Sequence, residues 1–209
     1  MASIVDLLQS DMGKQLIGGA SAQSGQTVEK TSSVLNMALP FLLGAMKNNS
    51  ATPEGADGLL SALKGKHNGG LLDNLGGLFD GGVDETVQKD GDGILGHILG
   101  GNKTKIETAL GNKSEMDPSA VAQILKVSAP ILMAILGKQA QQSNVTDSNG
   151  LSDVLGGLMG GKQEDQNFIL SFLDADGDGS VIDDVAGMVL GNNNKKGGIG
   201  GLLGKLFGN

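Results

Sequence analysis

Apolar residues recur along this chain at intervals of three and four, the spacing of a helix with one buried face. No segment keeps the strict alternation of apolar and polar residues that is typical of a strand. Three of the helical stripes are Leu71, Leu72, Leu75, Leu78 and Phe79; Leu151, Val154, Leu155, Leu158 and Met159; and Ile199, Leu202, Leu203, Leu206 and Phe207. The pattern therefore predicts an all-α fold.

The two most apolar segments span residues 32–46 and 121–136, and each has a central proline, Pro40 or Pro130. Both segments are shorter than the ~20 apolar residues that a membrane-spanning helix needs. We therefore expect them to form buried core helices that are kinked where proline removes a backbone hydrogen bond. Asp117, followed directly by a proline, is typical of a helix start and predicts where the second of these helices begins.

Similar segments repeat at an offset of 90 residues. VLNMALPFLLGAM aligns without gaps with ILKVSAPILMAIL, so that Pro40 coincides with Pro130. A polar linker and a short amphipathic unit follow each copy, and both halves later reach a DGDG tetrapeptide, at residues 90–93 and 176–179. The order of elements indicates an internal duplication, to which the alternative is chance similarity between leucine-rich helices.

The repeats suggest how the chain is organised. We expect an internally duplicated bundle of short glycine-rich helices around the two proline-kinked helices. This domain would span residues 1–161, with repeat halves at about 27–93 and 106–160. An EF-hand-like helix–loop–helix at 162–190 would pack on it, and residues 191–209 would form a glycine-rich linker and an amphipathic tail.

The composition narrows the possible functions. The chain has 209 residues, 36 of them glycine, and it contains no cysteine, arginine, tryptophan or tyrosine. Thiolate metal sites and disulfides are therefore excluded, and the two histidines are too few for a multi-histidine metal site. The net charge of −8 and the lack of arginine argue against a nucleic-acid partner.

We see no signal peptide or membrane span, so we expect a cytoplasmic protein. We expect His67 to be exposed in a polar loop and His97 to lie in the core.

The acidic residues gather in one segment. Residues 163–194 contain seven acids and no lysine, whereas the rest of the chain is nearly neutral. Within this segment, Asp174, Asp176 and Asp178 take positions one, three and five of the EF-hand loop pattern, and a glycine stands at position six, where the loop turns sharply. Ser180, at position seven, would offer its backbone carbonyl. Alternating carboxylates in a tight loop suit Ca²⁺, so we predict a calcium site here.

One position departs from this pattern. Position twelve, which normally holds a bidentate Glu, is Val185. We expect Asp184 to close the site, with Asp183 as the other candidate. The alternative is an Asp/Gly-rich turn without metal. The earlier DGDG at 90–93 lacks an acid at position one and a closing acid, so we interpret it as a degenerate, metal-free loop.

The segment IETALGNKSEMDPSAVAQILKVSAPILMAIL, residues 106–136, resembles the bacterial YidB-like family. In that family an ALG segment precedes a polar turn and a helix with a central proline, and longer members carry a DGDGS loop. The loop at 174–185 also resembles those of EF-hand and dockerin modules. The resemblance implies an all-helical bacterial protein of unassigned function.

The tail and the loop suggest what the protein does. The apolar stripe from Ile199 to Phe207 would dock on its own domain or on a second copy. We therefore expect a non-enzymatic scaffold or interaction protein, stabilised by Ca²⁺ and self-associating or bound to a protein partner. One alternative is a membrane-surface protein that acts through the tail, whose lysines and amphipathic pattern suit a lipid surface. Another is a hydrolase-type enzyme, although no catalytic motif stands out.

Overall fold

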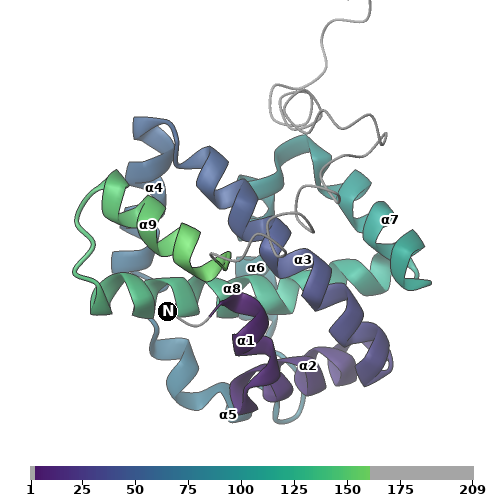
Figure 1. Ribbon diagram of the computed structural model, residues 1–209. Coiled ribbons are helices and arrows are strands. Elements are labelled where there is room, and N and C mark those ends of the chain that lie inside the picture. The colour runs from purple at the N-terminus through teal and green to yellow at the C-terminus, as the bar shows by residue number, and fades with distance from the viewer. Residues whose placement is uncertain (1–2, 161–209) are drawn as a thin grey trace, which may run out of the picture.

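A computed structural model describes residues 3–160, and within this range every regular element is a helix. This confirms the predicted all-α fold (Figure 1). The elements are α1 (Ile4–Gln9), α2 (Asp11–Ser24), α3 (Val28–Asn49), α4 (Pro53–Lys64), η1 (Gly70–Asn74), α5 (Leu75–Phe79), α6 (Glu85–Leu99), η2 (Gly100–Asn102), α7 (Lys103–Ser114), α8 (Pro118–Gln142) and α9 (Ser148–Leu158).

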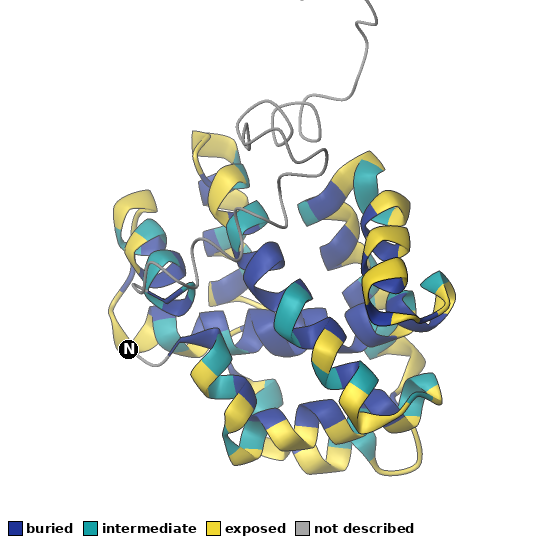
Figure 2. Cartoon of the chain, turned by 45° about the vertical axis from the view of Figure 1, so that its right-hand side comes forward, coloured by how far each residue is buried: buried dark blue, intermediate teal, exposed yellow. Residues whose placement is uncertain are grey.

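Helix α8 is the centre of the bundle. It runs across the molecule, and α2, α3, α4, α6, α7 and α9 all contact it (Figures 1 and 2). Several of its apolar side chains are fully buried, among them Val121, Ile124, Leu125, Ile131 and Leu136. A helix that is apolar over most of its surface has to be covered by its neighbours, which is why the other helices pack around this one.

The same helix is long and apolar enough to cross a membrane by length and composition alone. However, 78% of its most apolar window is buried by the rest of the fold, as expected for a core helix. A cytoplasmic location stays a prediction.

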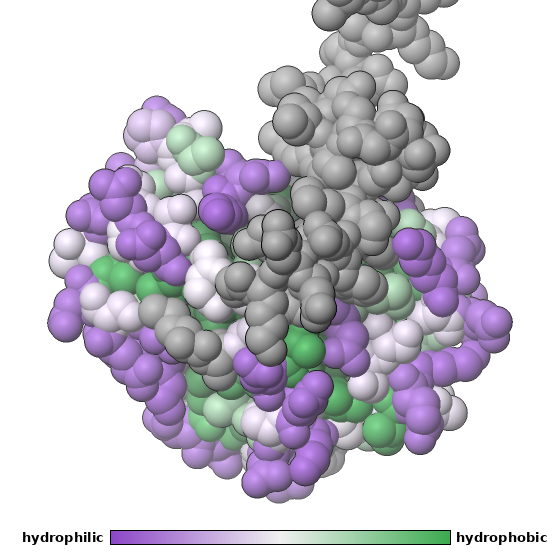
Figure 3. Space-filling model, viewed as in Figure 1, coloured by the Kyte–Doolittle hydropathy of each residue, from purple (hydrophilic) through white to green (hydrophobic). Residues whose placement is uncertain are grey.

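The described surface is mostly polar. Within residues 3–160, Val28 is the large apolar side chain that is exposed, at 52%. Figure 3 shows hydrophilic side chains along the edges of one face, with smaller apolar patches between them.

Side chains fix where the core helices begin. Asp117 accepts a hydrogen bond from the backbone N–H of Ser119 at the start of α8, which confirms the predicted helix start. Pro40 and Pro130 lie, as expected, within α3 and α8, and both helices continue past them. A kink at either proline stays a prediction. The hydroxyl of Ser128 donates to the carbonyl of Ile124 at 2.6 Å.

The helices that precede α3 and α8 end in the same way. Gly25 and Glu115, 90 residues apart, both adopt a left-handed backbone conformation just before these core helices. One residue earlier, Ser24 and Ser114 each donate to the carbonyl four residues back, at 2.7 and 2.6 Å. These features agree with the alignment of the two halves, whereas an internal duplication stays a prediction.

Candidate functional site

The predicted calcium site and tail lie outside the described residues. The same holds for the whole helix–loop–helix at 162–190. The calcium site therefore stays a prediction, and so does the docking of the tail. The residues concerned are Asp174, Asp176, Asp178, Ser180 and Asp184 of the loop, and Ile199, Leu202, Leu203, Leu206 and Phe207 of the tail.

The first DGDG tetrapeptide is helical, so the predicted loop at residues 90–93 is wrong. It lies in the middle of α6, which begins after Asp84, whose carboxylate accepts a hydrogen bond from the N–H of Thr86 at 2.7 Å. This bond holds the pKa of Asp84 below its ordinary value. Burial of Ile94 and Leu95 against the core stabilises the helix, and this packing outweighs the cost of three internal glycines.

At Gly91 the backbones of α6 and α8 lie very close together. A Cβ at this position would lie 2.7 Å from the carbonyl carbon and 3.0 Å from the Cα of Lys126. The Lys126 carbonyl is also the one that cannot accept the usual helical hydrogen bond, because Pro130 has no N–H. Only glycine allows the two backbones to come this close.

On one side of Gly91, Asp90 holds the loop that follows α4. Its carboxylate pairs with Lys66 Nζ at 2.7 Å and lies 3.8 Å from His67 Nε2. His67 is only 8% exposed, so the expectation that it is exposed is wrong. The loop folds over α8 and places the backbone of His67 against Gly137. Burial lowers the pKa of His67, a shift that Asp90 opposes and Lys66 reinforces.

On the other side, Asp92 joins three helices. Its carboxylate accepts a hydrogen bond from Lys103 at the start of α7 and lies 3.1 Å from Nζ of Lys126 in α8. Hydrogen bonds from Lys103 and then Lys126 hold the pKa of Asp92 below its ordinary value.

His97 lies further along α6 and is exposed, so its predicted place in the core is wrong.

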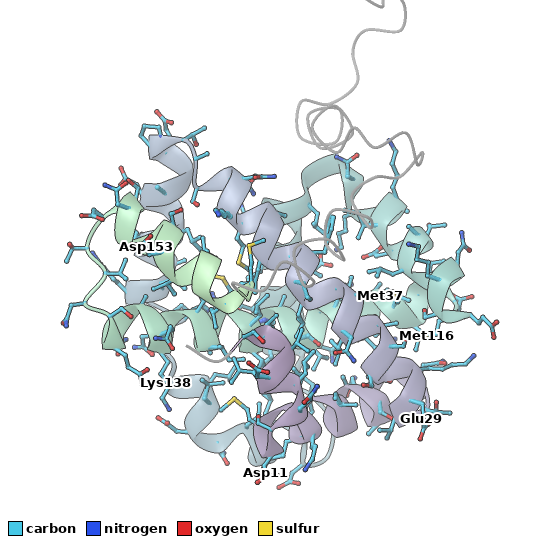
Figure 4. All side chains as sticks on the ribbon, viewed as in Figure 1. Asp11, Glu29, Met37, Met116, Lys138 and Asp153 are labelled. Atoms are coloured by element: carbon cyan, nitrogen blue, oxygen red, sulfur yellow. The ribbon has the colours of Figure 1, made fainter. Side chains whose placement is uncertain are left out.

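Glu107 lies beside this ion-pair cluster. It is 8% exposed, and its Oε1 atom has no hydrogen-bond partner. Burial raises the pKa of Glu107; Lys103 and Lys126 oppose that shift and Asp92 adds to it. Asp11, by contrast, is an outer charge that points away from the bundle (Figure 4). Glu107 is the functional candidate that the sequence analysis missed.

Two signals in the sequence point to Glu107. It stands three residues before Leu110 and directly after Ile106, both buried, so the helical stripe already includes its position. At the offset of 90 residues, the corresponding position holds Ile17, which is 7% exposed. If the predicted duplication holds, Glu107 is a carboxylate at a position that a hydrocarbon side chain can fill, and a buried carboxylate is uncommon in a core.

The described residues limit what this cluster can hold. Residues 3–160 contain no group of three or more His, Asp or Glu side chains placed to hold a metal ion. The described residues enclose a small cavity away from the ion-pair cluster. It lies between α1, α2, α3 and α8 and is lined by apolar side chains. Its volume of about 10 Å³ is close to the minimum for one water molecule.

The ion pairs of Asp92 should contribute little stability. Its side chain is 48% exposed, and pairs that solvent screens to this degree are worth about 1 kcal/mol or less. We expect Asp92→Asn to lower the free energy of unfolding by no more than about 1 kcal/mol in urea denaturation. Asp11→Asn is the matched control, because its partner Lys14 is also exposed and the expected change is near zero. A loss of several kcal/mol for Asp92→Asn would contradict this picture.

Taken together, the described residues define an all-α bundle around one apolar helix, with a buried carboxyl group beside an ion-pair cluster. The chain belongs to the DUF937 family, described as bacterial proteins of unknown function, whose family model matches residues 6–139. The match covers the ion-pair cluster, Glu107 and most of α8. It confirms the expected membership of a bacterial family of unknown function. No curated protein and no solved structure matches the chain.

Proposed function

We propose that the protein is a non-enzymatic helical scaffold that binds a protein partner or a second copy of itself and is stabilised by Ca²⁺. The observation that carries this proposal is how the described part of the chain uses its clustered charges. Asp90 pairs with Lys66 in the loop after α4, and Asp92 pairs with Lys103 and Lys126 on neighbouring helices. Such carboxylates are not free to act as a general acid or base.

The calcium part of the proposal rests on the sequence of residues 174–184. Three aspartates at alternate positions repel one another unless a cation lies between them. An ion that binds the folded state and not the unfolded chain adds stability by mass action, about 2.7 kcal/mol at a hundred times its dissociation constant. Ca²⁺ would thus support the fold and hold the loop in one conformation.

The two DGDG segments provide a matched test of calcium binding. We expect Ca²⁺ to raise the melting temperature of the full chain above its value in EDTA, because binding favours the folded state. Asp176→Asn should remove this rise, since it takes away a proposed ligand. Asp90→Asn should keep it, because Asp90 lies in a helix and pairs with Lys66. Thermal melts of the three proteins followed by circular dichroism make the measurement.

The outcomes separate the parts of the proposal. Equal melting temperatures in Ca²⁺ and EDTA for the unmodified chain would contradict the calcium site. If Ca²⁺ also failed to raise the melting temperature of Asp90→Asn, the loss seen in Asp176→Asn would not be specific to the proposed calcium ligand. Sedimentation of the same samples tests self-association, for which we expect a mass above that of one chain. A monomer that also binds no protein partner would contradict the scaffold itself.

A further inference from the structure

Glu107 is enclosed by helices and has no hydrogen bond at one carboxyl oxygen. It belongs to α7, which packs against α8, α3 and α6. Its neighbours on the buried face, Ile106 and Leu110, are 6% and 0% exposed. An ionised carboxylate in such a place loses its hydration without gaining full compensation, whereas a neutral carboxyl loses much less. The position therefore favours the protonated side chain.

The charges that face Glu107 come from three helices. Lys103 is one turn earlier on α7, Lys126 is on α8 and Asp92 is on α6. Helix α3 also packs against α7, but among the described residues none of its charged groups acts on Glu107. Both lysines already bond to Asp92, so neither is free to neutralise Glu107 fully.

The first half of the chain indicates that packing alone does not require a carboxyl group here. Ninety residues earlier, Ile17 fills the corresponding place on α2 and is 7% exposed. The position that corresponds to Lys126 is Asn36. The carboxyl group and the lysine thus occur together in only one of the two halves. A hydrocarbon side chain suffices in the other.

We propose that Glu107 is a proton-operated latch for α7. While the carboxyl group is neutral, α7 packs closely against α8 and α6. When the group ionises, opening of α7 becomes easier because the carboxylate regains its hydration outside the core. The latch lies within the bundle and is independent of the proposed calcium loop.

The direction of the pH effect follows from proton linkage. The pKa of Glu107 is raised above its ordinary value of 4.5, so in a window above pH 4.5 the folded state holds a proton that the opened state has lost. The contribution of Glu107 to stability is therefore fully present below pH 4.5. It is lost as the pH rises through the folded-state pKa. Asp92 acts in the opposite direction, since its pKa is lowered.

Hydrogen exchange of the full chain at a series of pH values tests the latch. Exchange rates, corrected for intrinsic chemistry, give the opening equilibrium of α7, with α9 as the internal reference. In the unmodified protein we expect α7 to open up to about tenfold more for each pH unit within the window, and then to level off. Glu107→Gln should remove this dependence, because glutamine fills the same space and does not titrate.

Two further variants make the result decisive. Glu85→Gln is the matched control, because Glu85 is exposed on α6, and it should keep the pH dependence. Glu107→Ile, which places the residue type of position 17 at this site, should be as independent of pH as Glu107→Gln and replaces that variant if it does not fold. The proposal is overturned if the unmodified α7 opens equally at every pH, or if the Glu107 variants keep the dependence. Neither result would bear on the calcium site.

Discussion

Gly91→Ala should lower the free energy of unfolding by about 3 kcal/mol, whereas Gly93→Ala should raise it by up to about 1 kcal/mol. The two glycines lie two residues apart in α6, so the substitution gives both variants the same gain in helix propensity. Their surroundings differ. A Cβ at 91 meets the backbone of Lys126, and a Cβ at 93 meets nothing within 4 Å.

The cost at position 91 arises because the atoms that the Cβ would meet belong to backbone. A flexible side chain could rotate away, but the Lys126 carbonyl is fixed within the central helix. To admit the methyl group, α6 has to move away from α8, and this separates the buried Ile94 and Leu95 from the core. The ion pair between Asp92 and Lys126 would lengthen as well.

Urea denaturation followed by circular dichroism gives both free energies. The main result is whether the two substitutions change the free energy of unfolding in opposite directions. This outcome does not depend on how far the bundle relaxes around the new methyl group. Two destabilised variants would mean that α6 tolerates no alanine for reasons other than its contact with α8. Two stabilised variants would contradict the close approach of the two helices.

Leu125→Ala should lower the free energy of unfolding by about 2–5 kcal/mol. Leu125 is fully buried in α8, the helix that most other elements contact. Removing its side chain leaves a cavity that the surrounding helices cannot easily fill, because the packed interior relaxes only partially. The loss of buried apolar surface adds to the cost of the cavity.

Leu125→Met is the matched control for this prediction. Methionine has a similar volume and a flexible side chain, so the change should cost less than about 1.5 kcal/mol. Urea denaturation of the two variants beside the unmodified protein provides the comparison. Equal losses for alanine and methionine would indicate that the shape of leucine matters more than the volume it fills. A loss below 1 kcal/mol for alanine would contradict the central place of α8.

The sequence predicted the helices and the core because both depend on local regularities. The spacing of apolar residues placed the amphipathic helices, among them α9 with its buried Leu151 and Leu155. Asp117 marked the start of α8, since a capping side chain acts on backbone groups only two or three residues away. The length and apolar character of residues 121–136 were enough to identify a core helix.

Sequence reasoning was wrong where distant residues decide the structure. The DGDG pattern at 90–93 suits a turn when judged locally. It is helical because Gly91 contacts Lys126, 35 positions further along the chain, and because α6 is held against the core. His67 is buried by the loop that folds over α8, and His97 is exposed because it lies on the outer face of α6.

By itself, then, the sequence determined that the fold is helical and that residues 32–46 and 121–136 belong to the core, because helix period and end caps act over a few residues. Only the tertiary structure brought Asp92, Lys103, Lys126 and Glu107 together from three helices. Whether a carboxyl group is paired or isolated depends on the atoms that surround it in space. Those atoms come from parts of the chain that no local pattern connects.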